Sequence, residues 1–175
     1  MPDVKSRDAL WFRWLWISAL VLVLDQLTKH AIISAFQYGE SRVVLSWFNL
    51  VLAHNTGAAF SFLADMPGWQ RPFFITLSLV ISAVLLWMLR GNHYNRLLSA
   101  ALALVIGGAI GNLYDRVFYG YVVDFIDWHA FGRHWPAFNV ADSAICLGAA
   151  LLIIDSFRKP APGNSADANP GKSAS

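Results

Sequence analysis

The apolar residues of this chain gather into long runs that are separated by charged side chains. The two clearest runs, residues 73–89 and 97–114, contain no charged residue. Each run approaches the roughly 20 residues that an α-helix needs to cross the hydrocarbon core of a bilayer. The pattern therefore predicts two membrane-spanning helices, over residues 72–90 and 97–115.

Two further apolar stretches are interrupted by charge. Residues 14–36 contain Asp25 and Lys29, and residues 140–157 carry an aspartate near each end. Charged side chains near the end of a membrane helix can reach the interface, and deeper ones face a polar cavity or a partner. We therefore predict that both stretches also span the membrane, which gives four transmembrane helices.

The segment after the first span has a different pattern, because residues 41–52 are rich in β-branched and aromatic side chains. This composition is typical of strands and predicts a small sheet at the membrane surface. An exposed sheet edge can bind an extended peptide by strand addition. We predict one integral-membrane domain, residues 1–159, and a disordered cytoplasmic tail over residues 160–175, which lack large apolar side chains.

Composition supports a membrane protein. The 175 residues are 57% hydrophobic and only 14% charged, whereas about a quarter of the residues of an average soluble domain are charged. The net charge of +2 is small, and the basic residues flank the predicted spans without forming a basic stripe. We therefore expect no nucleic-acid function.

The distribution of lysine and arginine predicts the orientation, because cytoplasmic loops carry the excess of these residues. With four spans, both termini and the middle loop share one side, and that side receives eight of the 13 basic residues. These are Lys5, Arg7, Arg13, Arg90, Arg96, Arg158, Lys159 and Lys172. We therefore predict that both termini are cytoplasmic.

Two aspartates lie beside membrane-length apolar segments. Asp124 is flanked by Val122, Val123 and Phe125, and Asp142 follows Asn139 at the start of the last span. An ionisable group in such a setting is costly and indicates a functional site. Two carboxylates held close together share a proton, so that one can activate a water while the other polarises a carbonyl. Asn139 is a candidate helix cap, which would favour the charged form of Asp142 and leave the proton to Asp124.

Other readings of these residues stay open at this point. The aspartates could be steps in a proton or ion pathway, or satisfied residues at helix ends. A hydrolase that uses Ser61 or Ser46 with Lys29 is a second enzymatic alternative, although pairing with Asp25 would make Lys29 a poorer base. The sequence has no His-Glu-x-x-His motif, so we predict no metal site. We expect the single cysteine, Cys146, to be an inert core residue.

Five motifs carry a resemblance to a known family. In order, they are Asp-Gln-Leu-Thr-Lys at 25–29, Asn-Thr-Gly-Ala-Ala-Phe at 55–60, Gly-Gly-Ala-Ile-Gly-Asn-Leu-Tyr-Asp-Arg at 107–116, Val-Val-Asp-Phe-Ile at 122–126 and Phe-Asn-Val-Ala-Asp at 138–142. Together they resemble the bacterial lipoprotein signal peptidase family (signal peptidase II). The resemblance covers the chain from about residue 14 to residue 157.

The resemblance implies an intramembrane aspartic endopeptidase that removes signal peptides from prolipoproteins, on the N-terminal side of the diacylglyceryl-modified cysteine. Its catalytic pair falls on Asp124 and Asp142, as the residues themselves suggest. Six further positions would bind substrate or position the pair: Asn55, Gly57, Gly108, Asn112, Arg116 and Asn139. Three would give structural support: Asp25, Lys29 and Asp115.

The resemblance also implies a mainly α membrane protein of the bacterial inner membrane. It would have four transmembrane helices, a small periplasmic β-cradle, an active site near the periplasmic face and a short surface helix or lid, here residues 63–71. The implied partners are lipid-modified prolipoprotein substrates and membrane phospholipids. We expect no cofactor and no obligate protein partner.

Overall fold

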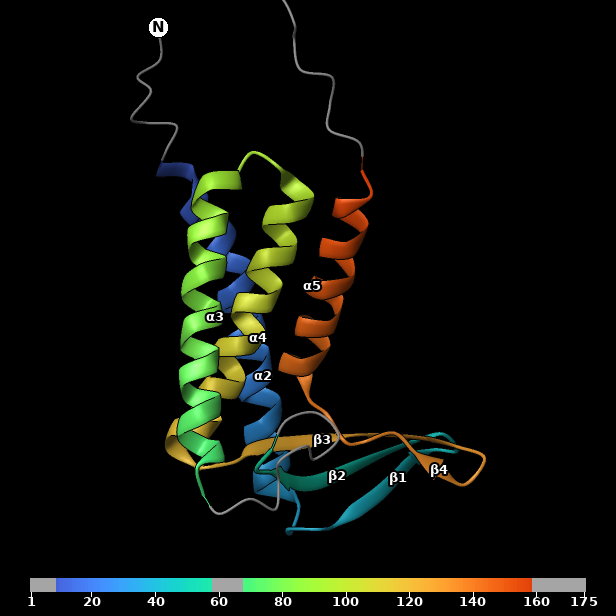
Figure 1. Ribbon diagram of the computed structural model, residues 1–175. Helices are drawn as coiled ribbons and strands as arrows, with labels where there is room; N and C mark the ends of the chain where they lie inside the picture. Colours follow the sequence, from blue (N-terminus) through green and yellow to red (C-terminus); the bar gives the residue numbers. More distant parts are fainter. Residues whose placement is uncertain (1–8, 58–67, 159–175) are drawn as a thin grey trace, which may run out of the picture.

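The computed structural model describes residues 9–57 and 68–158 of the chain. Four long helices form a bundle, and a small antiparallel sheet lies across one end of it (Figure 1). The helical elements are the 3₁₀ helix η1 (Ala9–Trp14), α2 (Leu15–Ala35), α3 (Gln70–Asn92), α4 (Arg96–Phe118) and α5 (Val140–Ser156). The strands are β1 (Ser41–Leu45), β2 (Phe48–Asn55), β3 (Val122–Ala130) and β4 (Arg133–His134).

Within the described residues, three helical segments are long and apolar enough to cross a membrane: Trp11–Ala35, which includes α2, and the helices α3 and α4. Helix α5 has 17 residues, a rise of about 26 Å, which is slightly less than the roughly 30 Å of a hydrocarbon core. The fourth predicted span therefore stays a prediction, although α5 runs alongside α4 (Figure 1).

The predicted lid, residues 63–71, lies mostly outside the described residues. Its last two residues, Gln70 and Arg71, form the first turn of α3, so that part of the prediction is wrong. Arg71 instead donates hydrogen bonds to the carbonyls of Arg116 (2.9 Å) and Val117 (2.8 Å) in the last turn of α4. Carbonyls in that turn have no partner within the helix, so the guanidinium of α3 satisfies them.

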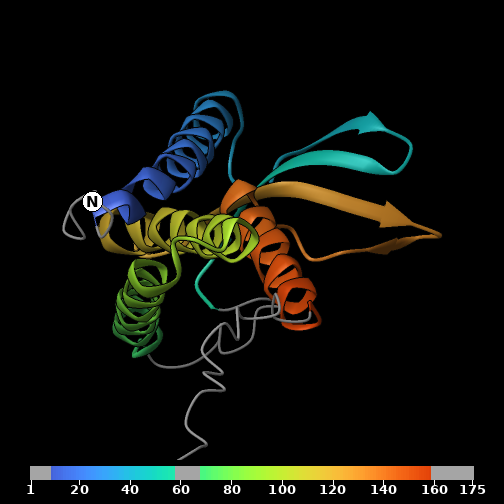
Figure 2. The ribbon, with the colours of Figure 1, turned by 90° about the horizontal axis from the view of Figure 1, so that it is seen from above.

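Helix α4 lies between α2, α3 and α5, as Figure 2 shows from above. Its glycines permit this close packing on two sides. A side chain at Gly107 would meet the backbone of Ser18 in α2 at 2.9 Å, and one at Gly108 would collide with the carbonyl of Ala141 in α5. Gly111 also faces α2, against Asp25, so Gly107 and Gly111 are a pair of small residues at the contact between these two helices.

The sheet has the strand order β1-β2-β3-β4, with antiparallel neighbours. The predicted strand over residues 41–52 is therefore confirmed as a hairpin. Between Leu50 and Ala53, the register of β2 against β3 shifts by one residue, so that Ala53 pairs with Asp124. This bulge decides which side chains share a face, because a one-residue shift moves the whole set to the other side of a strand.

The two faces of β3 have different neighbours. Val123 and Phe125 point to one face and pack with Leu52 and with Ile32 at the end of α2, in an apolar cluster. Asp124 points to the opposite face, as the alternation of a strand requires. The packing of the apolar face thus directs the carboxylate of Asp124 away from α2.

The chain then returns to β3 before it enters α5. Strands β3 and β4 form a hairpin, and Phe138 pairs with Ile126 through backbone hydrogen bonds of 2.8 and 3.1 Å. This bridge brings Asn139, the residue before α5, beside the start of β3. The loop between Asp124 and Asp142 therefore folds back to the strand that carries Asp124.

Candidate active site

Asp142 lies in the first turn of α5, where the capping of the helix fixes its position. The side chain of Asn139 accepts a hydrogen bond from the Asp142 N–H (2.9 Å), and the Asp142 carboxylate accepts one from the Asn139 N–H (3.3 Å). This reciprocal arrangement is a capping box. The predicted cap is confirmed, and it makes Asp142 part of the start of the helix.

Two asparagines connect Asp142 with Asp124. Asn112 of α4 donates to Asp142 Oδ1 at 2.7 Å, and Asn139 donates to Asp124 Oδ1 at 2.7 Å. The two asparagines also contact each other, since Asn139 Nδ2 lies 3.2 Å from Asn112 Oδ1. We call Asp124 and Asp142 the dyad, and Asn112 and Asn139 the asparagine bridge.

A third asparagine binds the other oxygen of Asp124. Asn55, at the end of β2, donates from Nδ2 to Asp124 Oδ2 at 3.0 Å. The contact depends on the bulge in β2, because the shifted register puts Asn55 rather than His54 on the face of Asp124. The strand alone would not have predicted this partner.

The surroundings of Asp124 raise its affinity for a proton. The side chain is 2% exposed, and this burial raises the pKa of Asp124 to about 7, with a further contribution from the nearby charge of Asp142. The hydrogen bonds from Asn55 and Asn139 act in the opposite direction, since they favour the ionised form. The charge of Lys29 acts in the same direction as these hydrogen bonds, but burial outweighs all of them.

A second pair of carboxylates lies next to the dyad, and a lysine forms an ion pair with both of them. Lys29 Nζ lies 2.8 Å from Asp25 Oδ2 and 2.8 Å from Asp115 Oδ2. All three side chains are fully buried, with exposures of 0 to 1%. The predicted ion pair between Asp25 and Lys29 is confirmed, whereas Asp115 was not expected as its second partner. We call Asp25, Lys29 and Asp115 the ion trio.

The ion trio is bonded to the backbone on both sides of the dyad. Asp25 Oδ1 accepts from the N–H of Ala141 at 2.9 Å, and Asp115 Oδ2 accepts from the N–H of Val123 at 3.0 Å. Ala141 and Val123 are the residues that directly precede Asp142 and Asp124. Each carboxylate of the trio therefore fixes the peptide next to one member of the dyad.

Two more contacts complete this support. Lys29 donates its third hydrogen bond to Asn112 Oδ1 at 3.1 Å, which joins the ion trio to the asparagine bridge. Gln26 donates to Asp25 (3.1 Å) and Asp115 (2.9 Å). Sequence reasoning assigned no role to Gln26, although its place beside Asp25 in the first motif was a signal for one.

Arg116 is 9% exposed and connects α4 with the end of β2. Its Nη2 donates to the carbonyl of Gly57 at 2.9 Å, and the Gly57 N–H in turn donates to Asn55 Oδ1 at 3.0 Å. The guanidinium also lies over the ring of Phe74, 4.9 Å from its centroid. Among the described residues, Arg116 Nε has no hydrogen-bond partner, which leaves a buried donor available.

Gly108 contributes through packing. Since a side chain here would collide with the carbonyl of Ala141, glycine lets α5 approach α4 closely. Asn112 lies one helical turn further along α4, so this approach brings it within hydrogen-bond distance of Asp142. Gly108 thus acts on the dyad through the distance between two helices.

A cavity of about 560 Å³ opens beside the dyad. Asp142, Asn55, Asn112 and Arg116 contribute polar groups to it, and most of the remaining wall is apolar. This combination is typical of a site that binds an apolar chain and orients it by a few polar contacts. The other lining residues are Val122, Trp128, Trp135, Pro136, Ala137, Phe138, Ser143, Ile145 and Cys146.

Cys146 corrects one prediction. It is exposed and lines this cavity, so it is not a core residue. The reason is helical spacing, because Cys146 lies four residues after Asp142 and shares its face of α5. The same spacing from Asp142 would have identified it as a cavity residue.

The alternative chemistries have less support from the positions of their residues. Ser61 lies outside the described residues, and Ser46 lies in the turn between β1 and β2. Lys29, their proposed base, is saturated by Asp25, Asp115 and Asn112. Across residues 9–57 and 68–158, no group of three or more His, Cys, Asp or Glu side chains is placed to hold a metal ion.

Comparison with solved structures gives the class of protein. The chain superposes on two bacterial membrane enzymes solved by the in meso method. One has a TM-score of 0.74 at 34% identity, covering 82% of this chain and 87% of the other. The second has a TM-score of 0.76 at 32% identity, covering 85% and 94%. The fold is thus that of a bacterial membrane enzyme.

Sequence comparison gives the family. Residues 17–158 match the family described as signal peptidase (SPase) II. A lipoprotein signal peptidase of Ralstonia nicotianae is 55% identical over 146 residues, which cover 83% of this chain and 84% of the relative. One from Janthinobacterium sp. is 54% identical over 154 residues, covering 88% and 93%. The chain belongs to the signal peptidase II family, and the expected resemblance is confirmed.

Proposed function

We propose that this chain is an intramembrane aspartic endopeptidase that removes signal peptides from prolipoproteins, on the N-terminal side of the diacylglyceryl-modified cysteine. The relatives are lipoprotein signal peptidases, which supports the substrate class. One observation carries the chemistry: Asp124 and Asp142 are joined by the asparagine bridge beside a largely apolar cavity. Carboxylates in this relation can share one proton and act together on a peptide bond.

The two aspartates take different roles. Asp124 carries the proton and donates a hydrogen bond to the scissile carbonyl oxygen, because its pKa of about 7 keeps it protonated below neutral pH. Asp142 accepts a hydrogen bond from Asn112 and lies at the positive end of α5, so of the two aspartates it carries the negative charge and acts as the base. Asp142 removes a proton from a water whose oxygen attacks the carbonyl carbon. It then returns that proton to the leaving nitrogen as the C–N bond breaks.

The cavity wall supplies the groups that position the substrate. Arg116 Nε is a buried donor that lacks a partner among the described residues, and a carbonyl oxygen of the substrate backbone would satisfy it. Asn55 lines the same cavity and already binds Asp124. The apolar wall accommodates the hydrophobic part of the signal peptide and an acyl chain, which orients the scissile bond at the dyad.

The membrane arrangement follows from the same proposal. We place α5 across the membrane as a fourth span, both termini in the cytoplasm and the sheet at the periplasmic face of the inner membrane. The basic side chains Arg13, Arg90, Arg96 and Arg158 support this orientation, since they lie at the end of the bundle opposite the sheet. Membrane phospholipids surround the enzyme, and catalysis requires no protein partner or cofactor.

Substitution of each aspartate tests the mechanism. Purified wild type, Asp124→Asn and Asp142→Asn are incubated with a diacylglyceryl-modified prolipoprotein and with its unmodified counterpart. We expect cleavage of the modified substrate alone, and a loss of at least about a thousandfold in each variant, because each removes one half of a unit that works together. Cleavage by either folded variant at more than a tenth of the wild-type rate would reject the dyad.

Two matched variants control for the loss of a carboxylate. Asp127→Asn removes a buried carboxylate from the same strand as Asp124, where Asp127 binds Asn49 and His134. Asp155→Asn removes a carboxylate from the end of α5 that is opposite Asp142, where Asp155 accepts a hydrogen bond from Asn95. Both should keep activity within a few-fold of wild type. The transport alternative would instead be supported if wild type carried protons across the membrane of liposomes and Asp124→Asn did not.

A further inference from the structure

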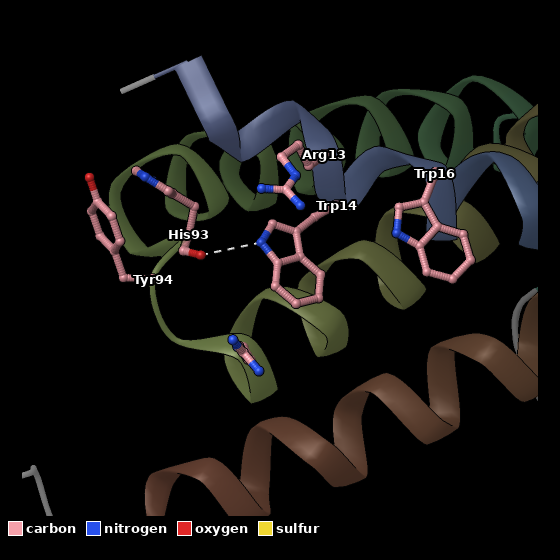
Figure 3. Close-up of a pocket in the computed structure, with 6 residues that line it drawn as sticks. Arg13, Trp14, Trp16, His93 and Tyr94 are labelled. Carbon is pink, nitrogen blue, oxygen red and sulfur yellow. Dashed lines mark hydrogen bonds between the residues drawn. The ribbon is translucent and has the colours of Figure 1, made fainter. Parts of the chain in front are cut away.

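A second cavity lies at the opposite end of the bundle from the dyad. Its volume is about 490 Å³, and three segments build it: the start of the first span, the turn between α3 and α4, and the first residue of α4. Figure 3 shows the side chains around this opening. We call it the arginine pocket; its lining residues are Arg13, Trp14, Trp16, His93, Tyr94 and Arg96.

The framework of the arginine pocket is fixed by packing. The indole of Trp14 donates to the carbonyl of His93 at 3.2 Å, which ties the start of α2 to the α3–α4 turn (Figure 3). Trp14 also packs on the buried cluster that contains Leu89 and Leu102. His93 is buried, and its ring lies against Tyr94 with a centroid separation of 3.9 Å. The pocket is therefore formed before any ligand binds.

Two arginines, Arg13 and Arg96, give the pocket a positive charge. Arg13 and Arg96 are both exposed, and neither forms an ion pair with another described residue. At this end of the bundle, the amide of Asn95 donates to both carboxylate oxygens of Asp155, at 3.1 and 3.0 Å. Two guanidinium groups beside aromatic rings select an anion that also has an apolar part.

We propose that the arginine pocket binds the phosphate and glycerol of an anionic phospholipid from the leaflet at that end of the bundle. Basic pockets between membrane helices bind anionic lipid headgroups, and tryptophan and tyrosine favour the headgroup level. The volume also suits a headgroup with its glycerol. The signal peptide of a substrate does not fit, because the segment before its apolar core is positively charged and the arginines would repel it.

Lipid retention by the purified full-length chain tests the proposal. Wild type is reconstituted in nanodiscs of phosphatidylglycerol and phosphatidylcholine in equal parts, released into detergent and examined by native mass spectrometry. We expect phosphatidylglycerol to be retained over phosphatidylcholine by about tenfold, the contribution of one charge-assisted hydrogen bond. The double variant Arg13→Gln, Arg96→Gln should abolish the preference. The double variant with lysine at both positions should keep part of it, because lysine retains the charge but lacks the paired N–H donors of the guanidinium.

Arg158→Gln is the matched control, since Arg158 is exposed at the same end of the bundle but lies outside the pocket. It should retain phosphatidylglycerol as wild type does. Equal retention of the two lipids by wild type, or an equal loss of preference in the control, would overturn the proposal. Displacement of the lipid by millimolar inorganic phosphate would also overturn the proposal, because it would identify a soluble anion as the ligand. Circular dichroism of each variant establishes that it is folded.

Discussion

Two pairs of buried carboxylates lie next to each other in this enzyme, and they are stabilised in different ways. Asp25 and Asp115 share the ammonium of Lys29 at 2.8 Å each. Asp124 and Asp142 are instead bound by the neutral amides of asparagines. A neighbouring cation strongly favours the ionised form of a buried carboxylate, whereas a neutral amide favours it less. The first pair is therefore suited to support and the second to proton transfer.

The largest effect should follow from removing the cation of the first pair. Lys29→Met leaves two buried carboxylates without compensation, and we expect the free energy of unfolding to fall by about 3–5 kcal/mol. Thermal unfolding in detergent measures this loss. Adding Asp115→Asn to Lys29→Met should recover part of it, because one unpaired charge is removed.

An exposed ion pair provides the control for this prediction. Arg42 and Glu40 are 2.7 Å apart at the surface, and Arg42→Gln should leave the unfolding temperature nearly unchanged. If Lys29→Met proved as stable as Arg42→Gln, then the ion trio would not be the support of the dyad.

The second prediction concerns a variant that places a cation beside the dyad, so that both pairs of carboxylates have one. In wild type, the rate should fall as the pH rises through about 7, because Asp124 loses the proton that it donates to the carbonyl. Asn55→Lys places an ammonium beside Asp124 and should lower its pKa by about 1–3 units. The falling limb of the pH–rate profile should then move to lower pH, with a loss of at least tenfold at pH 7.

Asn55→Met is the neutral counterpart of this change. It removes a hydrogen bond that favours the ionised form, so the falling limb should move to higher pH. Movement of both profiles in the same direction would contradict the assignment of the proton to Asp124.

A smaller effect should follow from weakening the asparagine bridge. Asn139→Ser keeps a cap for α5 but loses the amide that reaches Asp124. We expect the unfolding temperature to change little, and the maximal rate to fall by about tenfold, the contribution of one hydrogen bond to an ionisable group. Asn139→Ala removes the cap too and should lower the stability by a further 1 kcal/mol or so. Equal rates in Asn139→Ser and wild type would show that the bridge does not act on Asp124.

Much of this arrangement follows from local features of the sequence. The uncharged runs predicted α3 and α4, and the β-branched segment predicted strand structure where β1 and β2 lie. Asn139 was predictable as a cap because it stands directly before an apolar run, three residues ahead of Asp142. These features depend only on neighbours within one element.

The parts that sequence reasoning missed depend on contacts between distant elements. Asp115 lies 86 residues after Lys29, and no periodicity indicates that the two form an ion pair. The bulge in β2 decides that Asn55 faces Asp124, yet a register shift has no signature in the composition of the strand. The lid implied by the resemblance was extended to Gln70 and Arg71, whereas Arg71 binds the last turn of α4 from a neighbouring helix.

The backbone bridge between Ile126 and Phe138 closes a loop whose base lines the cavity beside the dyad. Both dyad residues lie outside that loop, Asp124 before it and Asp142 after it. At the far tip, Phe131 and Gly132 are exposed and have positive φ angles of 53° and 73°. The tip is therefore the place where insertions, affinity tags or fluorophores can be tolerated, because extra length there is absorbed beyond the bridge. The hairpin thus serves as a natural attachment point for reporters on a working membrane peptidase.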